Sequence, residues 1–523
     1  MSGPWLTLLW ALPAVGAVVA AAVPTVARWI GLLFSVGSLA IGIALACAFE
    51  PHHGYQFIES HRWIPAFGAG YTLGLDGTGL VLALLTAVLV PVLLLAGWRD
   101  AGGEKRGSGR RAGAYVALTL AVEAGVLLSF VTTDVLLFYL VFEGMLIPLY
   151  FLIGGYGGTG STEGERSRAA VRFLLYNLAG GLVMLAAVVG LYTVTARTPG
   201  LGGTFDLRAI APVAAHGGLA GGQLAQNLMF LGFMFAFAVK APLWPLHSWL
   251  PDAAVQSTPA TAVLMMALVD KVGTFGMLRY CLTLFPDASA RYGPWVCALA
   301  VIGIVYGAVM AIAQSDIMAL IAYTSISHFG FIILGVFART GDSQAGSVLY
   351  MVNHGVATAA LFLTAGVLVA RRGSRRIADF GGVWSVAPRL GAAFLVAGLA
   401  TLSLPGLGPF VSELMVVVGT FQRYPVAAVI AVSALVLSAL YVLWAYQRMF
   451  TGQPPATVTG TVADAGPRQL VFLAPLLAGV LVLGLYPGPV LDAVNPSVAA
   501  TSSETPASHT IWSATASASG VHR

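Results

Sequence analysis

Long apolar stretches recur along nearly the whole chain, and they constrain the fold more than any other feature of the sequence. A helix that crosses a membrane needs roughly 20 apolar residues, and runs of this kind follow one another from Trp5 to Leu491. Charged residues make up 9% of the 523 residues, against about 25% in a typical soluble domain. Because so few charges cannot cover a soluble globule of this size, we predict an all-α polytopic membrane protein.

The apolar runs leave room for about fourteen transmembrane helices and for no large soluble domain. We place the spans at residues 5–22, 29–49, 73–97, 113–131, 134–153, 172–196, 224–250, 256–285, 294–313, 316–338, 345–370, 384–420, 425–447 and 469–491. No basic residue precedes the first run, so we expect a retained helix rather than a cleaved secretory signal. The tail 495–523 is rich in Ser, Thr and Ala, and we expect it to be loosely ordered.

The distribution of Lys and Arg predicts an orientation for these spans. If the N-terminus lies outside and the spans alternate, 16 of the 26 basic residues fall in inside loops, 8 fall outside, and Lys240 and Lys271 lie within apolar runs. Two dense clusters, at 99–111 and 371–389, share the inside. Short inside loops of membrane proteins carry an excess of Lys and Arg, so we predict that both termini face the outer side. The net charge of +5 then reflects membrane topology and does not predict a nucleic-acid partner.

Proline interrupts two of the predicted spans in a similar way. The first interruption, near 240–251, contains three prolines, and the second, near 404–413, contains two. Proline removes a backbone donor, and within a membrane the freed carbonyl groups are tolerated only where protein or water satisfies them. Paired broken helices in two halves of a transporter indicate inverted repeats with the ion path at their interface. Each interruption lies close to a charge in an apolar setting, Lys240 or Glu413; ordinary proline kinks are the alternative.

Ionisable residues inside the apolar runs are the candidates for chemistry. A charge at the centre of a bilayer costs at least ~2.5 kcal/mol on insertion scales, so such residues are paired, hydrated or neutral, and they are usually functional. The candidates are Glu123, Glu143, Lys240, Asp270, Lys271 and Glu413, with His247, His328 and His354 as polar stepping stones.

Glu143 and Lys240 lie among apolar residues, and Lys271 lies in an apolar run directly after Asp270. Burial favours the neutral form of a lysine, whereas a nearby carboxylate favours the charged form. A Glu–Lys pair between helices can therefore act as a switch, because the lysine keeps its proton while the pair is closed and releases it when the pair opens. A proton pump needs such a residue between two half-channels. The alternative is a static buried ion pair that serves assembly.

The histidines suit a proton relay, because imidazole titrates near physiological pH and both donates and accepts hydrogen bonds. For His328 and His354, a packing role is the alternative, and axial ligation of a haem is a third interpretation. The three cysteines form no CxxC pair and cannot by themselves hold an iron–sulfur cluster or a zinc ion. Since no Walker A sequence or dinucleotide fingerprint occurs either, we expect no cofactor, metal or redox centre in this chain.

Taken together, several of these stretches resemble the antiporter-like subunits of respiratory complex I and of Mrp-type cation/proton antiporters. The resemblance is carried by the residues around Glu143, Lys240-Ala-Pro-Leu-Trp-Pro-Leu-His247-Ser-Trp-Leu-Pro-Asp252, Lys271-Val-Gly-Thr-Phe-Gly, Ile321-Ala-Tyr-Thr-Ser-Ile-Ser-His328-Phe-Gly and Leu404-Pro-Gly-Leu-Gly-Pro-Phe, all between residues 113 and 450. Most members of the family have lysine at the charged position of the twelfth helix. One complex I branch has glutamate there, and Glu413 is similar to that branch.

The resemblance implies fourteen helices with two inverted five-helix repeats. We accordingly expect helices 1–3 in residues 1–112 and a first repeat of helices 4–8 in residues 113–285. The second, inverted repeat of helices 9–13 would occupy residues 286–450, followed by the last transmembrane helix in 451–494 and a flexible tail in 495–523.

The resemblance also implies a function, namely proton translocation in the membrane arm of an NADH–quinone oxidoreductase, driven by quinone reduction in other subunits. Glu143 would pair with Lys240 and modulate it, and Lys271 would be the central proton carrier. The three histidines would line the hydrated path, and Glu413 would be the terminal site that feeds the outer side.

The partners implied are the lipid bilayer and the other complex I subunits, especially the neighbouring antiporter-like L and N subunits. NAD, FMN, iron–sulfur clusters and quinone are expected in partner subunits, and the implied location is the bacterial inner (plasma) membrane. An Mrp-type antiporter subunit is the alternative with the same fold, against which Glu413 argues, and a structural membrane scaffold is another. Departures from the family pattern at Ala254, Gln256, Asp270 and Met318 bear on the detailed proton route.

Overall fold

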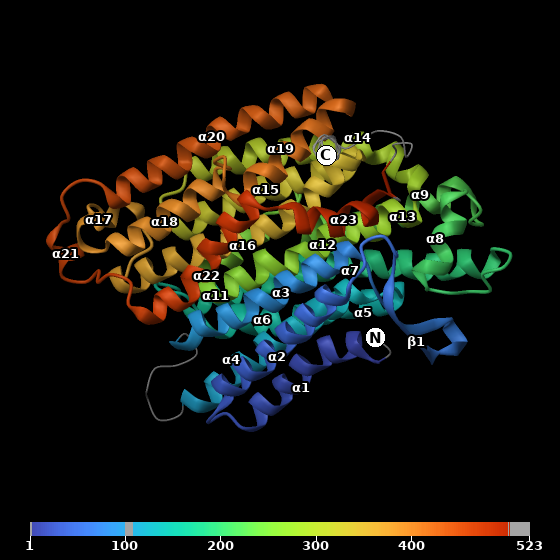
Figure 1. Cartoon of the computed structure of the whole chain (residues 1–523), viewed down its shortest axis with the longest axis horizontal. Coiled ribbons are helices and arrows are strands. Elements are labelled where there is room, and N and C mark those ends of the chain that lie inside the picture. Colours follow the sequence, from blue (N-terminus) through green and yellow to red (C-terminus); the bar gives the residue numbers. More distant parts are fainter. Residues whose placement is uncertain (1–2, 100–107, 500, 503–523) are drawn as a thin grey trace, which may run out of the picture.

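The structure of the chain is a computed structural model that describes residues 3–99, 108–499 and 501–502. Long helices lie side by side in one elongated bundle, and most of them run roughly along its longest axis (Figure 1). The all-α membrane fold expected from the sequence is confirmed. Within the described residues, 13 helices are long and apolar enough to cross a membrane.

These crossings correspond one by one to the predicted spans. They are α1 (Trp5–Ala22), α2 (Ala27–Ala48), α3 (Gly77–Ala96), α4 (Ser108–Val131), α5 with α6 (Val135–Gly144 and Leu146–Gly155), α7 (Glu163–Arg197), α9 (Gly222–Lys240), the continuous segment α11–η3–α12–η4–α13 (Pro259–Val263, Leu264–Val269, Asp270–Gly276, Met277–Cys281 and Leu282–Leu284), α14 (Pro286–Ile312), α15 (Ile317–Ala338), α16 (Gly341–Arg372), α20 (Pro425–Phe450) and α22 (Pro467–Leu485). The shorter elements are η1 (Pro65–Phe67), η2 (Gly97–Arg99), α8 (Leu207–Ala215), α10 (Trp249–Gln256), η5 (Ile377–Asp379), α17 (Val383–Val386), α18 (Pro388–Thr401), α19 (Gly408–Arg423), α21 (Ala456–Thr459) and α23 (Gly488–Ala499). Because α23 extends to Ala499, residues 495–499 of the expected flexible tail are helical; the rest of that tail, apart from 501–502, lies outside the described residues.

Both proline-rich interruptions are present. α9 ends at Lys240 and α10 begins at Trp249, and the chain between them turns without regular helix. The second break separates α18 from α19, and α18, with 14 residues, is too short to cross a bilayer alone. α18 and α19 together supply the remaining expected crossing.

A β-hairpin that was not expected from the sequence lies between α2 and α3. β1 (Gln56–Ile64) pairs antiparallel with β2 (Ala69–Leu75). Glu59 of β1 accepts hydrogen bonds from the backbone N–H groups of Leu6 at 2.7 Å and Thr7 at 3.2 Å. These N–H groups have no partner within α1 because they belong to its first turn, so the carboxylate caps the helix.

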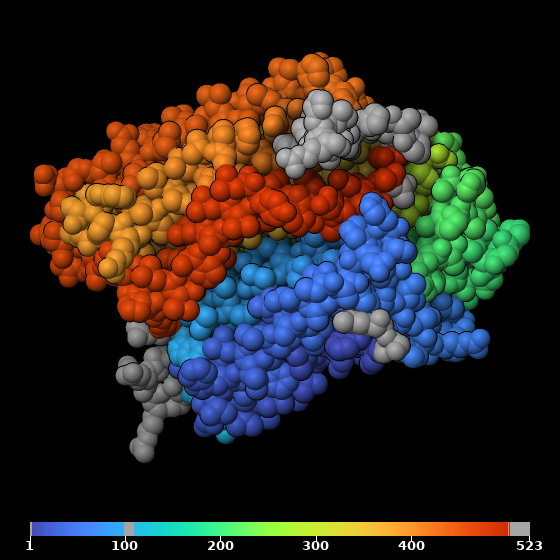
Figure 2. All heavy atoms as spheres, viewed as in Figure 1, coloured from blue at the N-terminus to red at the C-terminus, as the bar shows by residue number. Residues whose placement is uncertain are grey.

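The interior of the bundle is formed by residues 259–284, α15 and α16. In their most apolar stretches, 100%, 94% and 94% of the residues are buried, against 28% in α1, 28% in α2 and 33% in α20. Figure 2 shows the consequence: α1 and α2 cover one side of the molecule and α20 covers the other. The enclosed helices are those that carry Lys271, His328 and His354.

The two ends of the bundle differ. The hairpin and α8 lie at one end, and α17 and α21 lie at the other (Figure 1). At the α17–α21 end, arginines bind backbone carbonyl oxygens of neighbouring segments, as in Arg111 to Gly155 (2.8 Å) and Arg375 to Val255 (2.7 Å). Both arginines belong to the basic clusters that the sequence assigns to the inner side.

Candidate functional site

All seven side chains predicted to carry the chemistry come from the interior of the bundle. Six are nearly inaccessible, with exposed fractions of 1% for Lys240, 5% for His247, 0% for Lys271, 5% for His328, 2% for His354 and 2% for Glu413. Glu143 is half-buried as a residue, yet both of its carboxylate oxygens are buried. In so apolar a bundle, such groups depend on partners from neighbouring helices.

Lys240 is the last residue of α9, where the chain leaves the helix at the first break. Its Nζ atom donates to the carbonyl oxygen of Phe142 on α5 at 2.7 Å and lies 3.6 Å from the centroid of the Phe142 ring. The carbonyl groups at the end of a helix also favour a positive charge. No direct ion pair joins Lys240 to Glu143 in the described part of the chain, although the two interact electrostatically. Lys240 is therefore bound by Phe142, the residue directly before its predicted partner Glu143.

The carboxylate of Glu143 occupies space that a glycine leaves open. Gly181 of α7 faces it so closely that a Cβ atom there would lie 1.9 Å from Oε1. The adjacent Gly180 packs against α9 in a similar way, because a Cβ atom added to it would lie 3.2 Å from the Cα atom of Ala236. The Gly180–Gly181 pair thus lets α7 approach both α5 and α9. A glycine pair in an apolar helix is the sequence signal that could have revealed this contact.

Lys271 follows a stretch of π-helix. The widened turns of η3 and η4 flank the short α-helix α12 that carries the lysine, and such turns often occur at functional sites. The Nζ atom of Lys271 donates to the carbonyl oxygen of Met266 at 2.7 Å and lies 2.6 Å from Nδ1 of His354 on α16. It also lies 4.4 Å from the ring centroid of Phe329. The lysine is therefore fixed by one carbonyl, one imidazole and one aromatic face.

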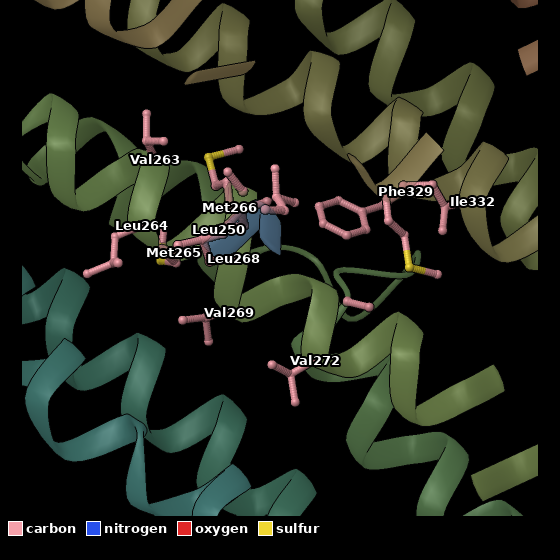
Figure 3. Close-up of a cluster of buried hydrophobic side chains, with 14 of the residues drawn as sticks. Leu250, Val263, Leu264, Met265, Met266, Leu268, Val269, Val272, Phe329 and Ile332 are labelled. Atoms are coloured by element: carbon pink, nitrogen blue, oxygen red, sulfur yellow. The ribbon is translucent and has the colours of Figure 1, made fainter. Parts of the chain in front are cut away.

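Apolar side chains enclose the segment around Lys271. Figure 3 shows Val269, two residues before the lysine, and Val272, directly after it, together with Phe329 and Ile332 from α15. None of these four can hydrogen-bond. The ammonium group therefore depends on the carbonyl and imidazole contacts just described, since an unpaired charge in such surroundings is strongly unfavourable.

A row of polar side chains continues from Lys271 through the second half of the bundle. The ring of His354 lies 5.4 Å from that of His328, measured between centroids. Nδ1 of His328 is hydrogen-bonded to the hydroxyl group of Tyr350, and Tyr350 interacts in turn with Glu413. We call Lys271, His354, His328, Tyr350 and Glu413 the polar row. It brings together four of the predicted residues and adds one.

Tyr350 was missed from the sequence because a single tyrosine in an apolar helix looks like a packing residue. It lies four residues before His354 on α16, so the two side chains share one face of the helix. This spacing is the signal that could have found it.

The contacts within the polar row give no support to the haem interpretation. The rings of His328 and His354 are already packed against each other, and each uses its Nδ1 atom for a side-chain contact. No group of three or more His, Cys, Asp or Glu side chains converges as metal ligands anywhere in the described residues.

Glu413 lies on α19, just beyond the second break. Ser403, within the break, donates its hydroxyl hydrogen to Oε2 of Glu413. The backbone of Ser403 has φ of 59°, a region that residues with a side chain rarely adopt. Asn353 of α16 donates from Nδ2 to the carbonyl oxygen of Gly408 at 2.6 Å. This bond ties the start of α19 to the helix that carries His354.

His247 lies apart from the polar row. It sits in the first break, where its ring packs against Tyr306 of α14 with 4.8 Å between the centroids. Its Nδ1 atom is buried and has no hydrogen-bond partner among the described residues. The structure does not bring His247 into contact with Lys240 or Lys271 in this part of the chain.

Two further buried carboxylates belong to the interior. Glu123 on α4 is 0% exposed and Asp270 on α12 is 1% exposed. All four of their oxygen atoms lack a hydrogen-bond partner in the described residues. Asp270 interacts electrostatically with Lys240 and Lys271, whereas Glu123 has no such neighbour.

Comparison with known proteins places this site in a family. The model of the NADH:quinone oxidoreductase/Mrp antiporter transmembrane family matches residues 132–438. The chain is 57% identical to a Mycobacterium tuberculosis protein named NADH-quinone oxidoreductase subunit M, over 95% of this chain and 93% of that protein.

Solved structures give the same result for the fold. A chain of respiratory complex I from Thermus thermophilus matches with a TM-score of 0.83 at 30% identity, covering 95% of this chain and 99% of that one. A chain of the Mrp complex from Dietzia sp. DQ12-45-1b matches with a TM-score of 0.82 over 95% of this chain and 97% of that one. The second likeness, at 23% identity, shows the fold alone.

The relatives named NADH-quinone oxidoreductase subunit M confirm the placement in a complex I branch that the sequence predicted. The chain therefore belongs to the NADH:quinone oxidoreductase/Mrp antiporter transmembrane family and, within it, to the subunit M branch of the NADH-quinone oxidoreductases.

Proposed function

We propose that this chain translocates protons as the membrane-arm subunit M of an NADH–quinone oxidoreductase. The observation that carries the proposal is the polar row, which joins Lys271 to Glu413 through an otherwise apolar core. Protons move along such a row because every member either titrates or carries a hydroxyl hydrogen. The energy comes from quinone reduction in other subunits and reaches the chain through electrostatic coupling between buried charges.

In the first half of the path, Glu143 controls the charge on Lys240. An approaching carboxylate stabilises the ammonium form, and a retreating one favours loss of the proton. The hydrogen bond from Lys240 to the carbonyl of Phe142 supports this role, because Phe142 and Glu143 are adjacent on α5. A small displacement of α5 therefore changes both contacts of the lysine at once.

In the second half, Lys271 is the central carrier and passes its proton to His354. The 2.6 Å contact between Nζ and Nδ1 is within the range for direct proton transfer. His328 and Tyr350 then carry the proton to Glu413, the terminal site toward the outer side. His247, in the first break, lines the hydrated approach to the lysines.

The membrane orientation and the partners follow from the same function. We place both termini on the outer side of a bacterial inner (plasma) membrane, which is supported by the basic residues at the α17–α21 end. The neighbours are the other complex I subunits, especially the antiporter-like L and N subunits. NAD, FMN, iron–sulfur clusters and quinone are held by partner subunits, and this chain contributes no redox centre.

An Mrp-type cation/proton antiporter subunit is the alternative with the same fold, and the likeness to the Mrp complex shows that shared fold alone. The identities favour complex I, since 57% and 30% belong to complex I relatives and 23% to the Mrp chain. Purification of the chain from its own membrane separates the two. Partner subunits with flavin and iron–sulfur clusters support complex I, whereas sodium efflux without NADH oxidation supports the antiporter.

Replacement of Lys271 by Ala tests the proposed function directly. In inverted membrane vesicles that contain the assembled complex, we expect K271A to lower NADH-driven proton uptake at least about tenfold, the scale of a lost acid–base group. Cys281→Ala is the matched control, because Cys281 is a buried residue of the same continuous helix with no place in the polar row. A K271A complex that assembles and pumps like the wild type would leave only a scaffold role for the chain.

A further inference from the structure

Asp270 is a buried charge that the pathway described above leaves unused. Only 1% of the residue is exposed, and neither carboxylate oxygen has a hydrogen-bond partner among the described residues. A buried carboxylate without hydrogen bonds is strongly unfavourable when ionised. Such a group inside a membrane bundle marks an ion path more often than a packing site.

Asp270 faces the end of α9. Gly273, three residues further along the same helix, packs so closely there that a Cβ atom on it would lie 2.9 Å from the backbone nitrogen of Ala241. Residues three apart share one face of a helix. The side chain of Asp270 therefore points toward the first break, where Lys240 ends α9.

Lys271 faces a different helix, although it follows Asp270 directly in the chain. Its Nζ atom meets His354 of α16. Ala267, four residues earlier, faces the same way, because its carbonyl oxygen lies 3.4 Å from a Cβ atom added at Gly355 of α16. Asp270 consequently stands on the turn between the two lysines and interacts electrostatically with each of them.

We propose that Asp270 carries the proton from Lys240 to Lys271, a step that rests on the proposed function. The ammonium group of Lys240 loses a proton to the carboxylate, which leaves a neutral amine and a carboxylic acid. The acid then gives its O–H proton to the neutral amine of Lys271, which becomes an ammonium group, and the carboxylate is restored. One proton moves, no electron moves, and no other reactant takes part.

The surroundings of Asp270 suit this exchange. Its two oxygens have no hydrogen-bond donor in the described residues, so no hydrogen bond there holds the carboxyl group toward one lysine rather than the other. The π-helical turns of η3 come immediately before it and widen the helix at this point. Among the described residues, the charged groups that interact with Asp270 are Lys271 and Lys240; Glu123 on α4 and His354 on α16, on helices packed against this segment, do not, nor do Arg279 and Tyr280 of η4. The two lysines are therefore its proton partners.

The test uses the complete complex in its native membrane, with Asp270→Asn and Asp270→Glu compared with the wild type. Asparagine keeps the shape but cannot carry the proton, whereas glutamate keeps the carboxyl group. We expect D270N to lower the number of protons translocated per NADH oxidised at least about tenfold and D270E to restore most of it. Thr274→Val is the matched control, since Thr274 is buried four residues further along the same helix.

The outcomes separate this proposal from the proposed function. If K271A stops pumping while D270N pumps normally, Asp270 is not a carrier but the function of the chain stands. If both variants pump normally, the proposed function itself fails. Equal loss of pumping in D270N and D270E points to a structural role for the carboxylate and overturns the relay.

A second measurement covers the case in which D270N does not assemble. Dicyclohexylcarbodiimide reacts with protonated carboxyl groups in apolar surroundings, so the wild-type complex is treated with it and its peptides are analysed by mass spectrometry. We expect a label on Asp270 that grows in step with the loss of pumping. Complete inhibition with label only on other carboxyl groups would contradict the relay.

Discussion

Gly181 and Glu143 share one small volume between α7 and α5. A Cβ atom added to Gly181 would lie 1.9 Å from Oε1 and 2.4 Å from Oε2 of the glutamate. Because no real contact is that short, the glycine determines where the carboxylate lies, and with it the distance from that carboxylate to Lys240. The position of the Glu143 carboxyl group, in the first half of the proposed pathway, is thus set by the missing side chain of Gly181.

Replacing Gly181 by Ala should displace the carboxylate of Glu143 and weaken its control over Lys240. A displacement of about 1 Å in a reacting group can lower a rate on the order of 100-fold, so we expect NADH-driven proton uptake to fall at least about tenfold in assembled complex. Gly190→Ala on the same helix is the control, because its new Cβ would meet only the flexible side chain of Met229 at 3.4 Å. Equal pumping by the two variants would show that Glu143 tolerates displacement.

Replacing Tyr350 by Phe should interrupt the polar row between His328 and Glu413. The ring keeps its packing, and only the hydroxyl group that contacts His328 is lost. We expect proton translocation per NADH to fall about tenfold or more, with normal assembly on native gels. Tyr280→Phe serves as control, since the Tyr280 hydroxyl group makes only a long contact of 3.4 Å with the carbonyl oxygen of Thr132. Unchanged translocation in Y350F would mean that protons bypass the tyrosine.

Replacing Glu59 by Ala should loosen the start of α1 without affecting pumping. The carboxylate caps the backbone N–H groups of Leu6 and Thr7, and a lost cap costs roughly 1–2 kcal/mol. We expect faster hydrogen–deuterium exchange in the first turn of α1, measured by mass spectrometry. Glu50→Ala is the matched control, because Glu50 lies before the same hairpin but its carboxylate is exposed and pairs only with the exposed His53. Exchange that is equally fast in both variants would rule out the cap.

Asp134, which caps α5 outside the membrane-spanning segments, should make stability depend on pH. Burial raises the pKa of its carboxyl group from 3.8 to about 6, and hydrogen bonds from the backbone of Gly70 and Leu137 oppose this only in part. Because the folded pKa lies above the unfolded one, the contribution to stability is full below pH 3.8 and is lost as the pH rises through about 6. The loss is about 3 kcal/mol at most.

The measurement for Asp134 is thermal unfolding of the purified complex between pH 5 and pH 7.5. In Asp134→Asn the amide oxygen still caps the helix but no group titrates, so we expect a smaller fall in melting temperature across this range than in the wild type. Parallel pH dependence in the two proteins would show that Asp134 does not titrate there.

The crossings could be predicted from the sequence because the length of an apolar run is itself the physical requirement for spanning a bilayer. The breaks at 241–248 and 402–407 could be predicted because proline removes backbone donors regardless of context. The hairpin of β1 and β2 could not, since short strands in a polar connection have no periodicity strong enough to outweigh an ordinary loop. Nor could η3 and η4, because a π-turn has the composition of the α-helix around it.

The candidate site was predictable as a set of residues but not as a set of contacts. Buried charge alone identified Lys240, Lys271 and Glu413. The acceptor for Lys240 is the backbone of Phe142, and every residue has a backbone carbonyl, so composition carries no sign of it. The roles of Gly181 and Tyr350 depend on which helices become neighbours, and this is decided by packing over the whole bundle.

Ser403 gives the second break a mechanical property. A left-handed backbone costs a residue with a side chain roughly 1–2 kcal/mol, and here the hydroxyl bond to Glu413 accompanies that conformation. The left-handed backbone conformation of Ser403 therefore depends in part on Glu413 as the acceptor of this hydrogen bond. The protonation state of one carboxyl group and the backbone conformation at the joint between α18 and α19 are thereby linked through a single hydrogen bond.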